Sequence, residues 1–152
     1  MALDIGDKTI GVAVSDEGLI LASPVETIKR RGPKADAIRV ETLVRERGVV
    51  RVVAGMPLTL RGEVGVQGLK VNDFIDTLKR RLRVPIETWD ERLTTREAER
   101  TLIEADLSRT RRKEIIDQMA AVLILQTYLD ARAHAQAAAS GGGGGPERDT
   151  RS

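Results

Sequence analysis

Acidic residues occupy three places in this chain where a solvated carboxylate is not expected. Asp4 interrupts the apolar stretch "MALDIG", Asp90 and Glu91 follow "PIETW", and Asp117 lies within "EIIDQMAAVLIL". A carboxylate surrounded by protein costs several kcal/mol unless a metal ion, a base or backbone donors accompany it. Carboxylates alone make a hard oxygen site that suits Mg²⁺ or Mn²⁺ and not zinc. Since two such ions about 4 Å apart can activate water and stabilise a leaving oxygen, these positions predict phosphodiester hydrolysis.

Each of these acids also has an ordinary structural interpretation. Asp4 could accept hydrogen bonds from the turn amides that follow it, and Asp90 could cap the next helix. Asp117 could pair with a neighbouring cation at the rim of its helix. Because side chains alternate along a strand, only one of Asp90 and Glu91 can face Asp4, and the sequence leaves open which one does.

These acids can meet only if distant elements bring them together. Apolar patterns predict three consecutive strands, a helix at 33–48, a strand at 49–55, a helix at 66–82, a strand at 85–91, and helices at 94–105 and 111–135. Pro24 is expected at an edge or bulge of the third strand, and Leu69 on the buried face of its helix. The order predicts an α/β fold, in which a mixed five-stranded sheet, first antiparallel and then parallel, is flanked by helices.

The length of 152 residues fits one domain, which we expect to span residues 1–136. The segment 137–152 contains five consecutive glycines and too few apolar residues to offset the entropy of ordering, so it is predicted to be a disordered tail. The chain has no cysteine, no signal-type segment and no apolar run long enough to span a membrane. These features predict a cytoplasmic protein.

Basic residues suggest a polyanionic partner. The chain has nineteen arginines and six lysines, and many of them fall in clusters at residues 29–32, 79–83 and 109–113. Arg61 in the loop "GMPLTLRGEVG" and Arg92 after the acidic pair are candidate phosphate contacts, as are Arg111 and Arg112 in the last cluster. An ion pair with a neighbouring acid is the alternative role for Arg92. With only three aromatic residues, base stacking cannot be the main mode of binding.

Four motifs in order resemble the YqgF/RuvX family of RNase H-like nucleases. They are "LDIGDKTIGVAVSD", "GMPLTLRGEVGVQG", "DERLTT" and "RRKEIIDQMAAVLILQTYL". The resemblance implies an RNase H-like fold and metal-dependent cleavage of structured nucleic acid by Asp4, Glu91 and Asp117. It also implies a phosphate contact at Lys8, although Thr9 stands where the second basic residue of that turn is usual.

The resemblance implies two possible activities. One is maturation of the 5′ end of pre-16S rRNA, which a monomer can perform, and this is our leading expectation. The other is resolution of Holliday junctions, which needs two active sites and therefore a homodimer. Two further classes are a nucleic-acid-binding module without catalysis and an actin-like ATPase or sugar kinase, which the "DIG" and "GVAVSD" stretches also resemble. An enzyme of the ATPase or sugar-kinase class needs two RNase H-like domains that close on ATP, and this chain is long enough for one.

Overall fold

The computed structural model of the chain describes the backbone of residues 1–93 and 109–141. Side chains are described for residues 1–92 and 119–141. The predicted helix at 94–105 and the glycine run at 141–145, apart from its first residue, lie outside the described residues. Among the described residues, no helix is long and apolar enough to cross a membrane.

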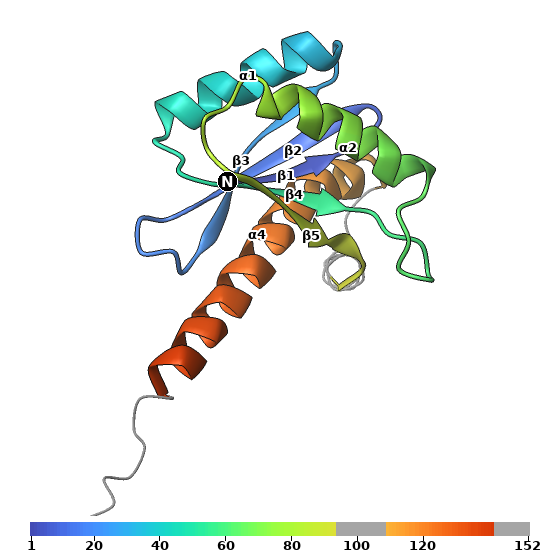
Figure 1. Ribbon diagram of the computed structural model, residues 1–152. Coiled ribbons are helices and arrows are strands. Elements are labelled where there is room, and N and C mark those ends of the chain that lie inside the picture. The colour runs from blue at the N-terminus through green and yellow to red at the C-terminus, as the bar shows by residue number, and fades with distance from the viewer. Residues whose placement is uncertain (94–108, 142–152) are drawn as a thin grey trace, which may run out of the picture.

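A single five-stranded sheet forms the centre of the molecule (Figure 1). Its strands are β1 (Ala2–Ile5), β2 (Thr9–Ser15), β3 (Ala22–Lys29), β4 (Val52–Met56) and β5 (Ile86–Asp90). They lie in the order β3-β2-β1-β4-β5. The pairs β1–β2 and β2–β3 are antiparallel, whereas β1–β4 and β4–β5 are parallel. The predicted mixed sheet is confirmed, and β3 is an edge strand whose register shifts beside Pro24, as that proline requires.

Helices cover both faces of the sheet. They are α1 (Pro33–Glu46), α2 (Val66–Lys79), a short 3₁₀ helix η1 (Glu91–Leu93) and α4 (Arg109–Gly141). Figure 1 shows α1 and α2 together on one face and α4 crossing the other. Helix α1 begins with a proline in its first turn, where the missing amide costs nothing, and Gly48 just beyond its end has a φ of 61°.

Strand alternation divides the core into two layers. Leu3 and Ile5 of β1 belong to the larger layer under α1 and α2. Ala2 belongs to the smaller layer under α4, together with Ala121 and Ile124 of that helix. Asp4 has the same parity as Ala2, so it lies on the α4 face of the sheet, as the alternation in "MALDIG" predicts.

The C-terminal half of α4 is fastened to strand β5 by an aromatic and polar network. The indole nitrogen of Trp89 donates to Thr127 Oγ1 at 3.1 Å, and the Trp89 and Tyr128 rings meet edge to face at 5.5 Å. The Tyr128 hydroxyl donates to Glu87 at 2.7 Å and accepts from Arg51 at 3.0 Å. These contacts fix the height and rotation of the helix over the sheet.

Two details differ from the sequence-based expectation. Leu69 was predicted on the buried face of α2 but is 59% exposed. It lies on the opposite side of the helix from the buried positions, which are Gly68, Val71, Phe74, Ile75 and Leu78. Helix α4 continues to Gly141, although the disordered tail was predicted from Ala137. The run of alanines before Gly141 explains the extension, since alanine has the highest helix propensity. For residues 142–152 the tail stays a prediction.

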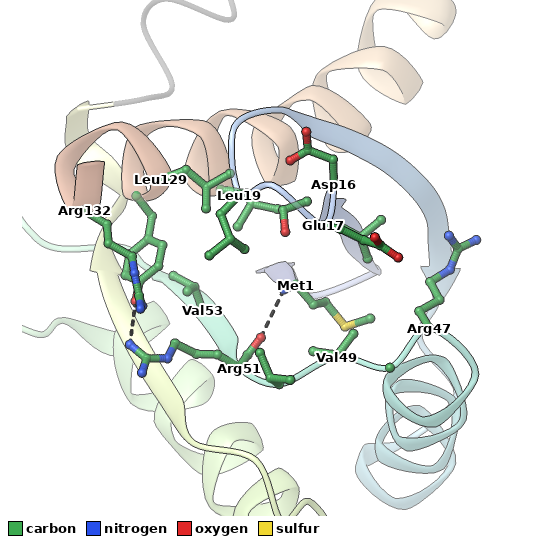
Figure 2. Close-up of a pocket in the computed structure, with 16 residues that line it drawn as sticks. Met1, Asp16, Glu17, Leu19, Arg47, Val49, Arg51, Val53, Leu129 and Arg132 are labelled. Atoms are coloured by element: carbon green, nitrogen blue, oxygen red, sulfur yellow. Dashed lines mark hydrogen bonds between the residues drawn. The ribbon is translucent and has the colours of Figure 1, made fainter. Parts of the chain in front are cut away.

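A cavity of about 690 Å³ lies at the end of the sheet where β1 begins (Figure 2). Its apolar lining includes Val53 and Leu129, and Arg51 and Arg132 stand at its side. Neither Asp4 nor Glu91 lines it. The predicted acidic site is therefore separate from this cavity and lies at the other end of β1.

Candidate active site

Asp4 and Glu91 meet at the C-terminal edge of the parallel strands. Asp4 lies near the end of β1, and Glu91 begins the 3₁₀ helix directly after β5, two strands away in the sheet. The two half-buried carboxyl groups share a hydrogen bond. Burial, reinforced by the hydrogen bond and the charge of Asp4, raises the pKa of Glu91 to about 8. In the metal-free protein Glu91 therefore remains protonated at neutral pH, and its carboxyl O–H donates the hydrogen bond to Asp4.

Asp90 faces away from this pair. Its carboxylate accepts the Arg92 guanidinium at 2.7 Å and 3.0 Å and the Arg92 backbone amide at 3.0 Å. The hydrogen bonds from Arg92 hold the pKa of Asp90 below its usual value. The structure thus places Glu91, and not Asp90, beside Asp4, and it gives Arg92 the ion pair that the sequence analysis considered as an alternative.

Gly55 in β4, which the sequence analysis did not single out, makes room for the acidic pair. It lies between β1, which carries Asp4, and β5, which leads into Glu91, on the face covered by α4. A Cβ atom there would be 2.6 Å from Ile124 Cδ1 and 3.5 Å from the Glu91 carboxyl carbon. A glycine inside an otherwise apolar strand is the signal that could have identified this close approach.

The third predicted acid, Asp117, lies within helix α4, as do Arg111 and Arg112. Their side chains lie outside the described residues, so their positions relative to Asp4 are predictions. The backbone of position 117 is one helical turn before Ala121, which is buried against the sheet. Among the side chains that the structure describes, no group of three or more His, Cys, Asp and Glu could hold a metal ion.

The described part of the site fits a divalent cation. Its donors are carboxylate oxygens, which Mg²⁺ and Mn²⁺ prefer. Two acids held together with a raised pKa are under electrostatic strain when both are ionised, and a cation between them would relieve it. Asp4 and Glu91 are therefore the residues that would hold such an ion.

Cationic side chains surround the same edge of the sheet. Lys8 is exposed in the β1–β2 turn, and the adjacent Asp7 forms an ion pair with Lys70 of α2 at 3.3 Å. Arg61 is exposed in the β4–α2 loop, and the Arg92 guanidinium lies against Gly62 of that loop, 3.5 Å from where a Cβ would stand. The structure thus places the Arg92 guanidinium beside the loop that carries Arg61. Lys70 lay outside every basic cluster in the sequence and could not have been selected.

The raised pKa of Glu91 predicts a specific pH dependence of stability. The folded state binds the proton more tightly than the unfolded state, so this group's contribution is complete below its ordinary pKa of 4.5 and is lost as the pH rises through about 8. We expect the melting temperature of the metal-free protein to fall with rising pH across that window more steeply than that of Glu91→Gln. Mg²⁺ should raise the wild-type value most at high pH. If the melting temperatures of the wild type and of Glu91→Gln changed equally with pH, the prediction would be wrong.

Comparison with known proteins identifies the family. A family model described as "RuvX: Holliday junction resolvase" matches residues 1–131. A relative from Desulforudis audaxviator, named "Putative pre-16S rRNA nuclease", is 51% identical over 132 residues, which is 87% of this chain and 94% of the relative. A relative of the same name from Clostridioides difficile is 48% identical over 135 residues, covering 89% and 96%.

The chain belongs to the RuvX family. The family predicted from the four sequence motifs is confirmed, as is the predicted class of enzyme, because both descriptions are of nucleases. A solved structure, "T. thermophilus RuvC in complex with Holliday junction substrate", aligns with a TM-score of 0.56 at 16% identity and covers 87% of this RuvX chain and 93% of that chain. This likeness confirms the RNase H-like fold.

Proposed function

We propose that this RuvX protein is a metal-dependent endonuclease that cleaves structured nucleic acid and matures the 5′ end of pre-16S rRNA. The observation that carries the proposal is the pairing of Asp4 with Glu91 at the edge where the parallel strands end. Strand ends of this kind are where α/β proteins bind ligands. The names of the relatives at about half identity support the RNA substrate.

Asp4 would hold the cation from β1 and Glu91 from η1, and Asp117 would complete the set from helix α4. An ion held there supplies an activated water and stabilises charge on the phosphate and on the leaving oxygen. The chain's own contribution is to bring carboxylates from three elements within reach of one phosphate. Gly55 keeps the space between them open, since its missing side chain would stand 3.5 Å from the Glu91 carboxyl carbon.

The cationic residues at the same edge would hold the nucleic-acid backbone. Arg92 is exposed and already oriented by Asp90 through three side-chain hydrogen bonds, so its guanidinium loses little freedom when it meets a phosphate. Arg61 and Lys8 are exposed on the neighbouring loops. Contacts of this kind position the substrate and carry little sequence information.

The experiment is a paired cleavage assay with Mg²⁺ or Mn²⁺. One substrate is a labelled pre-16S rRNA fragment that carries the 5′ extension, and the other is a labelled four-way DNA junction. We expect a defined cut in the RNA that Asp4→Asn abolishes. Cleavage of the junction alone, in symmetry-related strands, would favour the resolvase that the family model's description names. If the protein bound the substrates but cleaved neither, it would be a nucleic-acid-binding module without catalytic activity.

Arg92 and Arg61 should affect binding more than chemistry. We expect Arg92→Ala and Arg61→Ala each to raise KM by about tenfold, to change kcat by less than about threefold, and to reduce the salt dependence of binding by roughly one counterion. Arg39→Ala is the matched control, because Arg39 is an exposed arginine of α1 in an ion pair with Glu26. Equal effects in all three variants would show that the site edge has no special role.

A further inference from the structure

The strand that carries Asp4 is held differently on its two sides. Its parallel ladder with β4 pairs only Ala2 and Leu3, so it ends one residue before Asp4. Its antiparallel ladder with β2 continues through Ile5. The end of β1 that contributes to the site therefore depends on contacts beyond the β4 ladder for its position.

Arg30, the first residue after β3, supplies such contacts to the β1–β2 turn. Its Nη1 donates to the Gly6 carbonyl at 2.9 Å, and its backbone amide donates to the Lys8 carbonyl at 2.9 Å. Within the turn, the Gly6 amide donates to the Thr9 carbonyl at 2.9 Å. Arg30 thus holds the β1–β2 turn at Gly6 and Lys8, two and four residues after Asp4.

The Arg30 guanidinium is itself held by a buried acid and an aromatic ring. Its Nε donates to Asp36 Oδ2 at 3.0 Å, and its carbon lies 4.9 Å from the centroid of the Phe74 ring in α2. Asp36 is only 2% exposed, and its second oxygen accepts the Arg31 amide at 3.0 Å. A buried ion pair is tolerated when further hydrogen bonds satisfy both partners, which is the case here.

Asp36 is the one buried charged side chain in the part of the chain that the structure describes. An ion pair is a poor general stabiliser at such a place, since an apolar pair of similar volume would often be as stable. The ion pair does fix the orientation of the Arg30 side chain, because the N–H groups of a guanidinium point in fixed directions and can donate to only one arrangement of acceptors. In this orientation Arg30 Nη1 donates to the carbonyl of Gly6, which is two residues from Asp4.

We propose that Arg30, oriented by Asp36 and Phe74, is a positioning residue that sets where Asp4 stands relative to Glu91. It connects the α1–α2 layer to the sheet edge without reaching the site, since its side chain is 19% exposed and its polar contacts are with Gly6 and Asp36. The catalytic consequence of this inference rests on the proposed nuclease function. The structural consequence, a fixed β1–β2 turn, does not.

The test compares Arg30→Lys with Arg39→Lys, a matched change in an exposed ion pair of the same layer. Lysine keeps the charge but cannot contact Asp36 and Gly6 through a fork while lying on Phe74. We expect Arg30→Lys to weaken Mn²⁺ binding by about tenfold in calorimetry and to lower kcat with KM within about twofold, as for other residues that orient metal ligands. Amide hydrogen exchange at Gly6 should become faster in the metal-free protein. Arg39→Lys should change none of these.

Asp36→Asn provides a second variant, because it keeps the shape of the side chain and removes only the charge. Each variant is measured at a temperature the same number of degrees below its own melting temperature, so that a loss of stability alone does not change the Mn²⁺ affinity, the kinetics or the Gly6 exchange rate. Unchanged Mn²⁺ affinity and unchanged Gly6 exchange in the folded variants would overturn the inference. A wild-type protein that neither binds Mn²⁺ nor cleaves would overturn the proposed function instead, and Gly6 exchange would still decide the role of Arg30.

Discussion

Replacement of Glu91 by glutamine is expected to lower kcat by roughly 10³-fold while the protein remains folded. The amide cannot supply the negative charge that a cation needs, and loss of several kcal/mol of charge stabilisation corresponds to a factor of ten per 1.4 kcal/mol. Stability at neutral pH should rise and not fall, because Glu91 with a pKa of about 8 must take up a proton on folding there, whereas glutamine is neutral in both the folded and the unfolded state. The measurements are single-turnover cleavage and urea denaturation.

Glu87→Gln is the matched control for this substitution. Glu87 lies on β5, the strand that leads into Glu91, and on the face of the sheet that Glu91 shares, but its carboxylate contacts Arg51 and Tyr128. Glutamine at this position loses the ion pair with Arg51, which should lower stability. Its amide oxygen can still accept from the Tyr128 hydroxyl that anchors α4, so cleavage should stay within a few-fold of wild type. If Glu91→Gln cleaved as fast as Glu87→Gln, the acidic pair would have no catalytic role.

The second large effect is expected at Gly55, this time on stability. Gly55→Ala places a methyl group 2.6 Å from Ile124 Cδ1 and 3.4 Å from Cγ1, so helix α4 or the isoleucine must shift. Overpacking of this kind costs about 1 to 3 kcal/mol of unfolding free energy. Cleavage should fall as well, because α4 carries Asp117. Urea denaturation monitored by circular dichroism measures the first effect.

A double mutant tests the cause of that loss. Ile124→Val removes the Cδ1 atom that the new methyl group would meet, and alone it should cost about 0.5 to 1.5 kcal/mol. In the Gly55→Ala background it should cost less or restore stability, so the two changes should be strongly non-additive. Additive losses would mean that the clash with Ile124 is not the source of the effect.

Most of the fold could be predicted because its signals are local. Alternation in "MALDIG" assigned Leu3 and Asp4 to opposite faces, and the structure agrees. The change from period two to helical spacing after β3 marked where the helices begin. Leu69 was misplaced because it is apolar but lies on the solvent side of α2, so its residue type did not give the direction of its side chain.

The site could be predicted only in part, because it depends on which strand faces which layer. The family resemblance implied Glu91, but alternation alone could not choose between Asp90 and Glu91, since that choice requires the knowledge that Trp89 of the same strand packs on α4. With that contact fixed, alternation assigns Glu91 to the face of Asp4. Arg30 and Asp36 were beyond reach, because no local pattern shows that a helix acid will meet the residue after a strand.

The anchoring of α4 at Thr127 and Tyr128 has a consequence for how the enzyme can vary. The helix is a stiff rod that is pinned ten residues beyond position 117, a span of about 15 Å at the usual rise. A tilt of roughly four degrees about that pin would move the backbone at position 117 by about 1 Å, an error that can cost 10²-fold in rate. Substitutions at Trp89 or its partners can therefore change the rate of cleavage although none of the acidic residues of the site is substituted.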